Sequence, residues 1–293
     1  DCDVEVKEAE NQSVGRLFVS NFARGESAVY VPQGTVFGGG DQDREVLHSH
    51  LLAHGWEGNI PVRCVEEGRW NPSNRTDVER GYFTKDGTTT GLIQSEVTQE
   101  GTWTKAREFL KSAGVKKGTS VALVKTDKAL AVSEDQADSR YVGMVTQIDR
   151  GRGKAPLMYL DLFNGPSDTR ALMNRAISSY QKDADLIRKT DRARRISPSK
   201  DQAHDLIVEV MNTNADSTSG LSIGRNFDHT NGYRVVGLDV NNGIGHLHAT
   251  HTGESHPRNN SLGVLEGMRE RNAGEFKEGA ARAKTFQKTY GLH

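Results

Sequence analysis

The sequence predicts an α+β fold that is predominantly antiparallel β, in a sandwich or barrel-like arrangement, with three or more helices and a C-terminal helical appendage. Short apolar runs recur at a spacing of roughly ten residues and are separated by Gly, Asn and Asp, which is typical of strands joined by tight turns. The 31 glycines, against only 7 prolines, supply many positions for such turns. Apolar residues at helical spacing are confined to a few longer stretches, so helices are expected between groups of strands.

The composition indicates a polar protein with no net charge to select a partner. The 293 residues include 38 basic and 39 acidic side chains, so neither nucleic acid nor an anionic membrane surface is expected as a partner. Hydrophobic residues make up 34% and the mean hydropathy is −0.65. No apolar run reaches the roughly 18 residues that indicate a membrane span. We predict a β-rich main domain with inserted helices over residues 1–256 and a helical tail over residues 257–293.

The strands are expected in two groups. In the first group the apolar runs lie at residues 17–19, 28–31, 36–37, 46–52 and 60–65. Residues 71–91 lack any period and predict a long surface loop with a short hairpin near 82–85. Further strands are expected at residues 120–125, 130–132, 141–148 and 157–163, and a polar loop at 212–224. Residues 233–240 and 244–249 predict a closing hairpin around Asn241-Asn242-Gly243.

Three helices are predicted before the tail. The first covers residues 102–113 and is followed by Gly114 as a C-terminal cap. The second opens at Pro166 and keeps helical spacing as far as Ile187. It runs into a basic stretch at residues 188–195, interpreted as a solvated helix end because no aromatic residues interleave to stack bases. Ser199 with Gln202 forms a capping-box signature for the third.

The tail beyond Pro257 predicts two weakly amphipathic helical stretches, broken near Gly274. Such a tail packs either on its own domain or on a neighbouring subunit.

Two short motifs stand out between residues 34 and 70. The first is a glycine-rich turn with polar residues behind it, and the second is a strand that ends in charged residues. If the two strands pair, the turn and its charges could bind an anion such as a diphosphate. The alternative is that Arg44 and Glu66 only lock the turn to the strand end. The candidate ligand-binding residues are Gly39, Gly40, Gln42, Arg44, Glu66 and Arg69.

The same two motifs carry a family resemblance. GTVFGGGDQDRE followed by PVRCVEEGRW resembles the family named for its association with ADP-ribosylglycohydrolase and rhodanese-phosphatase proteins. The likeness continues at residues 93–97, 141–145 and 159–166, and in a helix that carries Arg175 to Tyr180. The resemblance implies a β-rich domain with a link, through its neighbours, to NAD or ADP-ribose metabolism. It implies no reaction mechanism.

Histidines gather in two places and raise the question of a metal. Residues two apart on a strand share a face, so His246 with His248, and His48 with His50, could each offer two imidazoles to one ion. His251 and Glu254 lie close enough in sequence to the first pair to add ligands. Neither cluster has the HExxH spacing of a hydrolytic zinc site. The candidate metal set is His246, His248 and His251, with no other cofactor expected.

The two cysteines leave the compartment open. Cys2 and Cys64 could form one disulfide in an exported protein, or stay reduced in the core. The start at Asp1 would fit removal of a signal peptide, but the sequence favours neither a secreted nor a cytoplasmic location. Glu66 and Glu67 beside Cys64 argue for a buried thiol and against a nucleophile.

Three functions follow as hypotheses. The first is a non-catalytic module that binds a nucleotide-derived ligand such as ADP-ribose or serves protein assembly, because no catalytic triad, carboxylate dyad or cofactor loop is recognisable. The second is an extracellular structural or self-assembling subunit, and a homo-oligomer is expected in either case. The third is a hydrolase that uses a His-bound metal.

Overall fold

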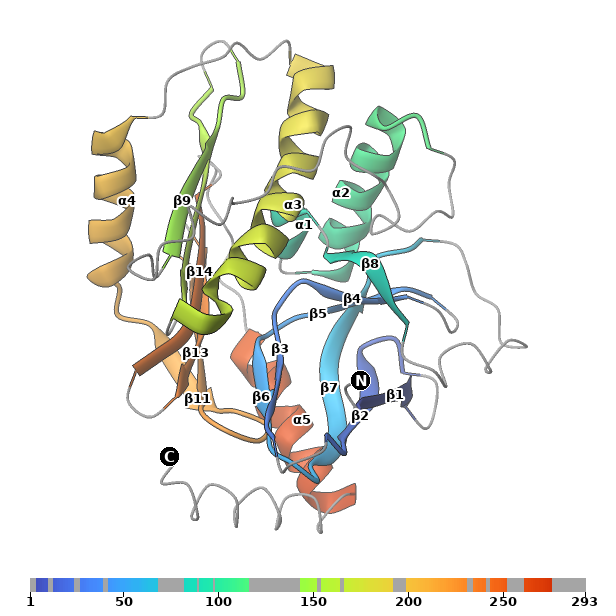
Figure 1. The fold of residues 1–293 in the computed structure, drawn as a ribbon. Coiled ribbons are helices and arrows are strands. Elements are labelled where there is room, and N and C mark those ends of the chain that lie inside the picture. The colour runs from blue at the N-terminus through green and yellow to red at the C-terminus, as the bar shows by residue number, and fades with distance from the viewer. Residues whose placement is uncertain are drawn as a thin grey trace.

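The computed structural model is described for residues 4–9, 13–23, 27–38, 42–67, 82–88, 90–96, 98–115, 143–151, 154–163, 166–191, 199–230, 234–240, 243–251 and 261–275. These residues form two six-stranded sheets, a small two-stranded sheet and helices on both sides of the second large sheet (Figure 1). Every strand pairing is antiparallel. The predicted α+β class with curled antiparallel sheets is therefore confirmed.

The first sheet is built from the N-terminal strands. Its order is β1 (Val4–Glu8), β2 (Arg16–Asn21), β7 (Glu57–Cys64), β5 (Arg44–Val46), β4 (Thr35–Gly38) and β8 (Tyr82–Thr88). Its core contains Val19, Leu17, Ile60 and Trp56, all of them buried. β8 corrects the prediction of a surface loop with a short hairpin near 82–85, because residues 82–88 form a single edge strand that pairs with β4.

The second sheet is built from the C-terminal half of the chain. Its order is β11 (Asp216–Ser219), β12 (Arg225–Thr230), β13 (Arg234–Val240), β14 (Gly243–His251), β10 (Leu157–Phe163) and β9 (Gly143–Ile148). β13 and β14 are the predicted closing hairpin. The prediction of a polar loop at 212–224 is wrong at β11. The strand was missed because its sequence, DSTS, lacks the apolar alternation of a half-buried strand. At the edge of a sheet with one buried side chain, Thr218, such a sequence is tolerated.

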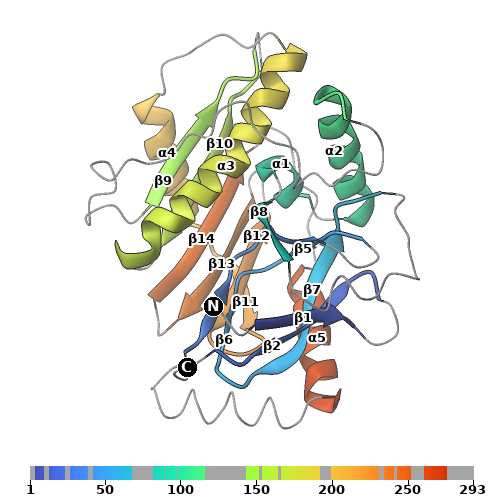
Figure 2. The same ribbon diagram turned by 45° about the vertical axis from the view of Figure 1, so that its right-hand side comes forward.

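Helices cover both faces of the second sheet. α4 (Lys200–Met211) packs Leu206 and Val210 on one face, against Val235 and Leu247. Figure 2 shows α3 (Pro166–Asp191) lying across the other face. There Tyr180 and Ile187 pack with Leu157 and Tyr159. As predicted, Ser199 caps α4 by accepting a hydrogen bond from the Gln202 backbone N–H.

α1 (Gly91–Gln94) and α2 (Gln99–Ser112) connect the two halves of the molecule. α2 matches the helix predicted at 102–113 but begins three residues earlier, where Thr98 caps it through the Gly101 backbone N–H. Its buried side chains Ala106, Phe109 and Leu110 pack on Val36 and Val65 of the first half. α1 was not predicted, because a single helical turn shows no period in the sequence.

The small sheet of β3 (Val29–Val31) and β6 (His50–Leu52) connects the two large sheets through hydrogen bonds. Ile223, just before β12, donates its backbone N–H to the Leu51 carbonyl at 3.0 Å. The Ser222 hydroxyl accepts from the Ala53 N–H at 2.9 Å, and the Asn226 amide donates to the Ser49 carbonyl at 2.9 Å. These bonds bring residues 49–53 against the second sheet, where the candidate site lies.

α5 (Ser261–Glu275), part of the predicted tail, packs on the same chain. Leu265 and Met268 are buried. The Asn272 amide bonds both the N–H and the carbonyl of Asn59 in β7, at 2.9 and 2.7 Å. No helix among the described residues is long and apolar enough to cross a membrane. The strands predicted at 120–125 and 130–132, and the second helical stretch of the tail, lie outside the described residues.

Candidate functional site

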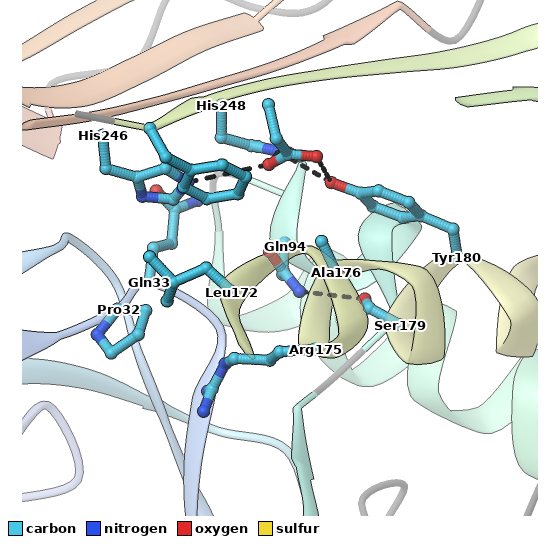
Figure 3. Close-up of a pocket in the computed structure, with 12 residues that line it drawn as sticks. Pro32, Gln33, Gln94, Leu172, Arg175, Ala176, Ser179, Tyr180, His246 and His248 are labelled. Carbon is cyan, nitrogen blue, oxygen red and sulfur yellow. Dashed lines mark hydrogen bonds and ion pairs between the residues drawn. The ribbon is translucent and has the colours of Figure 1, made fainter. Parts of the chain in front are cut away.

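A pocket lies between the second sheet, α3, α1 and the loop that follows β3 (Figure 3). It holds about 380 Å³ of empty space, its open mouth included. The sheet contributes polar groups, α3 contributes a wall of mixed character, and the loop and α1 contribute amides. The residues that line it are Pro32, Gln33, Gln94, Asp161, Phe163, Leu172, Arg175, Ala176, Ser179, Tyr180, His246 and His248.

The register of β10 and β14 gathers the polar residues of the sheet wall. Asp161 stands opposite His248, and Phe163 opposite His246. Because side chains alternate between the faces of a strand, all four point to the α3 side of the sheet. The neighbours Leu160, Leu162 and Leu247 point to the α4 side and fill that core.

Asp161 is the centre of this wall. It is 2% exposed, and its carboxylate contacts His248 Nδ1 at 3.0 Å and His246 Nε2 at 3.6 Å. The Tyr180 hydroxyl of α3 donates to its other oxygen. Burial alone would raise the pKa of Asp161, but the charge and hydrogen bond of His248, together with the more distant His246, outweigh burial and hold this pKa well below its usual value. Asp161 is therefore an ionised, buried carboxylate at neutral pH.

His246 is held in one orientation from behind. The Ser49 hydroxyl lies 3.0 Å from its Nδ1, and the same hydroxyl accepts bonds from the Gln33 backbone N–H and the Tyr30 hydroxyl, each at 3.1 Å. Phe163 stacks on the imidazole, with ring centroids 5.1 Å apart. Burial lowers the pKa of His246, so the ring is neutral at pH 7 and turns Nε2 toward Asp161.

The α3 wall carries a guanidinium. Arg175 lines the pocket and donates from Nη2 to the Thr35 hydroxyl of β4 at 2.6 Å. Burial lowers its pKa to about 10, which still leaves it charged at neutral pH. Ser179, one turn further along α3, accepts a hydrogen bond of 3.0 Å from the Gln94 side chain. Figure 3 shows Arg175 and Ser179 on the helix, across the pocket from His246 and His248.

Gln94 is placed by contacts from both halves of the molecule. The buried Arg234 of β13 donates to the Gln94 carbonyl at 2.7 Å and to the Glu96 carbonyl at 3.1 Å. Arg63 of β7 also donates to the Glu96 carbonyl. Gly34 has a φ of +73°, and a Cβ there would lie 2.4 Å from the Gln94 side chain, so glycine is required for this close approach.

A second polar layer lies behind the pocket. Tyr159 stacks on Tyr180 with parallel rings 4.0 Å apart, and its hydroxyl donates to Asp183 of α3 at 2.8 Å. Burial raises the pKa of Asp183 to about 6, although hydrogen bonds from Tyr159 and neighbouring backbone oppose the shift. This layer does not line the pocket. It fixes the Tyr180 ring, and through it the position of the hydroxyl that bonds Asp161.

The two sequence motifs meet in space, but not at this pocket. The Gln42 side chain donates to the Glu66 carbonyl at 3.1 Å and accepts from Arg44 Nη1 at 3.0 Å. The Asp43 N–H bonds the Glu66 carboxylate at 3.3 Å. Gln42, Arg44 and Glu66 are all buried. This geometry favours the structural interpretation of the three residues. Gly39, Gly40 and Arg69, the other members of the predicted set, lie outside the described residues.

The predicted metal residues do not converge on one point. His246 and His248 share a face as expected, but His251, an odd number of residues away on the same strand, points to the other face. Among the residues that the structure describes, no group of three or more His, Cys, Asp or Glu side chains is arranged to hold a metal ion. His48 and His50 are both buried. Glu254 lies outside the described residues.

Cys64 is a buried thiol, as predicted. Cys64 is buried, its thiol donates to the Glu66 carbonyl at 3.0 Å, and burial raises its pKa. It forms no disulfide within the described part of the chain, and Cys2 lies outside that part.

Sequence reasoning missed Asp161, Arg175 and Tyr180 as site residues. The stretches that contain them are part of the family resemblance, but the candidate ligand-binding residues came from the two motifs between residues 34 and 70. One signal was present: in Leu157–Phe163, with sequence LMYLDLF, a single carboxylate interrupts an apolar strand. A charge in such a position requires buried partners, and buried charges with partners gather at binding sites.

The fold defines the class of protein, a β-rich α+β domain with antiparallel sheets. More specifically, residues 1–250 match the family described as the ARG and Rhodanese-Phosphatase-superfamily-associated Protein domain, and the chain belongs to that family. Neither a curated protein sequence nor a solved structure matches the chain.

Proposed function

We propose that this chain is a non-catalytic module that binds a nucleotide-derived, anionic ligand such as ADP-ribose in the pocket between α3 and the second sheet. The observation that carries the proposal is Arg175, a buried guanidinium that lines a pocket and keeps its charge at neutral pH. Guanidinium groups bind phosphate and carboxylate oxygens through two parallel hydrogen bonds, and such bonds are strongest where water is excluded.

The titratable groups around the pocket support binding over catalysis. General acids and bases work best when their pKa values lie near the operating pH. Here the pKa of Asp161 is held well below its usual value and the pKa of Tyr180 is raised well above its own, so both move away from neutrality. The pKa of His246 is lowered by burial and moves in the same sense. These groups fix hydrogen bonds and charges in place.

The volume of the pocket limits what it can take. The enclosed part of the pocket, about 30 Å³, is far smaller than the roughly 300–1,000 Å³ that small-molecule sites commonly occupy. It can take only a small polar part of a ligand such as ADP-ribose, with the rest of the ligand at the mouth.

The test is a calorimetric titration of ADP-ribose into the wild-type protein and into Arg175→Gln. Loss of a charge-assisted bond should weaken binding about 10- to 100-fold. Arg188→Gln is the matched control, because Arg188 lies on the same helix, is 61% exposed and pairs with Asp185 at 3.1 Å. It should bind as the wild type does. Absence of ADP-ribose binding to the wild type would reject the proposal.

Arg44→Ala separates the pocket from the glycine turn. If the ligand binds at the pocket, folded Arg44→Ala protein keeps its affinity, since the Arg44 guanidinium bonds Gln42 and does not line the pocket. Loss of affinity in Arg44→Ala together with full affinity in Arg175→Gln would move the site to the glycine turn.

Protein assembly is a second candidate, and α4 favours it. Ile207, Val208 and Met211 are 38%, 42% and 58% exposed on the side of α4 away from the sheet. An apolar group of this kind suits contact with a second copy of the chain, as in a homo-oligomer or a self-assembling subunit. Light scattering should then give a mass above that of the monomer, and Val208→Lys with Met211→Lys should reduce it. A monomeric mass at high protein concentration would reject this candidate.

A further inference from the structure

Two polar groups of the sheet wall, His246 and Asp161, are not fully hydrogen-bonded to each other. His246 Nε2 and the nearer oxygen of Asp161 are 3.6 Å apart. Good N–H···O bonds join atoms about 2.7–3.2 Å apart, so this contact is too long to satisfy either group fully. Both residues line the pocket, and both are placed by other contacts: His246 by Ser49 and Asp161 by Tyr180 and His248.

The surrounding hydrogen bonds determine which of the two groups, His246 or Asp161, carries the hydrogen at this contact. Ser49 accepts from the Gln33 N–H and from the Tyr30 hydroxyl, which occupies both of its acceptor positions. Its own hydrogen is therefore directed to His246 Nδ1. A neutral imidazole has one ring proton, so that proton is on Nε2 and points to the pocket side. His246 is a donor there and Asp161 is an acceptor.

Asp161 retains capacity to accept. A carboxylate has about four acceptor positions. The hydrogen-bond contacts on Asp161 come from His248 and Tyr180, with His246 at the longer distance. A ligand group that reaches Asp161 must bring a hydrogen, because a second anion there would be repelled at short range.

From these observations we infer that Asp161 and His246 form a hydroxyl-binding subsite for a ribose-type, polyhydroxylated group whose anionic substituent is bound by Arg175. A hydroxyl accepts from His246 Nε2–H and donates to Asp161 at once. A phosphate cannot do both, and an alkyl group can do neither. The guanidinium on the opposite wall provides the partner for the phosphate. The inference rests on the proposed function and names the part of the ligand that enters the pocket.

A matched pair of ligands tests this without altering the protein. Ribose 5-phosphate and n-pentyl phosphate have the same number of carbons and the same charge, but only the first has hydroxyls. In wild-type protein, ribose 5-phosphate should bind at least about tenfold more tightly, since a site built to hydrogen-bond a hydroxyl rejects analogues that lack it. Equal affinity for the two ligands would overturn the inference.

A second experiment uses a protein variant. Asp161→Asn keeps the shape of the side chain and removes its charge, so it should weaken ADP-ribose and ribose 5-phosphate about tenfold or more. It should leave n-pentyl phosphate, which has no hydroxyl, unchanged or tighter. Asp185→Asn on α3, away from the pocket lining, is the control. Circular dichroism confirms that each variant is folded.

The two proposals fail in different ways. If wild-type protein does not bind ADP-ribose, the proposed function is wrong. If it binds ADP-ribose in an Arg175-dependent manner, while Asp161→Asn leaves that affinity unchanged, the function stands and the hydroxyl subsite is wrong. If neither ribose 5-phosphate nor n-pentyl phosphate binds measurably, the ADP-ribose affinities of the wild type and of Asp161→Asn decide whether the hydroxyl subsite exists.

Discussion

The glycine-turn cluster of Gln42, Arg44 and Glu66 and the pocket cluster of Asp161, His246 and Arg175 are both buried and polar, but their polar atoms have different partners. At the turn, the side chains bond one another and nearby backbone. At the pocket, Asp161 and His246 lie 3.6 Å apart and both line the cavity, so a third group in the cavity can contact both of them. Burial of charge alone therefore does not indicate a site. The distinguishing feature is whether the polar atoms face empty space.

The largest effect that separates the clusters is expected on stability. Arg44→Ala should lower the free energy of unfolding by about 3–5 kcal/mol, because it removes a buried guanidinium and leaves Gln42 and Glu8 without that partner. Denaturant unfolding followed by tryptophan fluorescence measures this. Arg107→Ala is the control: its ion pair with Glu67 is at the surface, with Arg107 52% exposed, and should contribute less than about 1 kcal/mol.

If Arg44→Ala were as stable as Arg107→Ala, the turn cluster would not be structural. The turn cluster would then be a candidate ligand site again, and the two clusters would no longer differ in function.

A smaller effect is expected from a third kind of buried polar group, one without a hydrogen-bond partner in the part of the chain that the structure describes. His50 is 2% exposed, and neither ring nitrogen has a hydrogen-bond partner among the described residues. Burial, together with the charge of His48, lowers its pKa from 6.5 to about 3. The unfolded chain therefore binds a proton below pH 6.5, while the folded protein does not until about pH 3.

The contribution of His50 to stability is thus complete above pH 6.5 and is lost as the pH falls toward 3. Between pH 7 and pH 4 the loss should be on the order of 3 kcal/mol. Since carboxylates titrate in the same range, the measurement is the difference between wild type and His50→Leu in unfolding free energy from pH 7 to pH 4. His204→Leu, at a side chain that is 75% exposed, is the control for the replacement of a histidine by leucine itself. Parallel curves for wild type and His50→Leu would show that His50 is solvated or paired.

The elements of the fold could be predicted where a pattern repeats. The spacing of Met173, Tyr180 and Ile187 gave α3, and Ser199 with Gln202 gave the start of α4. β11 and α1 could not be predicted, because four residues are too short to show a period and packing from distant parts of the chain decides their structure.

The site was less accessible than the fold for a physical reason. Alternation along β14 placed His246 with His248, and the same alternation should have excluded His251. The partners of those histidines come from β10, α3 and the loop before β6, far apart in sequence. Only the strand register and the helix packing bring Ser49, Asp161 and Tyr180 to one place. A single sequence does not contain that register.

The smallest effect tests whether the pocket depends on Gln94 as well as on its charges. Gly34 and Gly114 both have positive φ, +73° and +68°, but only at Gly34 would a Cβ meet another residue, the Gln94 side chain at 2.4 Å. Alanine at either position should cost roughly 1 kcal/mol of stability through the left-handed backbone. Gly34→Ala should in addition displace Gln94 from Ser179 and weaken ADP-ribose several-fold, whereas Gly114→Ala should not. Equal affinities would show that Gln94 only lines the pocket, and recognition would then rest on Arg175, Asp161 and His246, the charged or proton-donating groups that line the pocket.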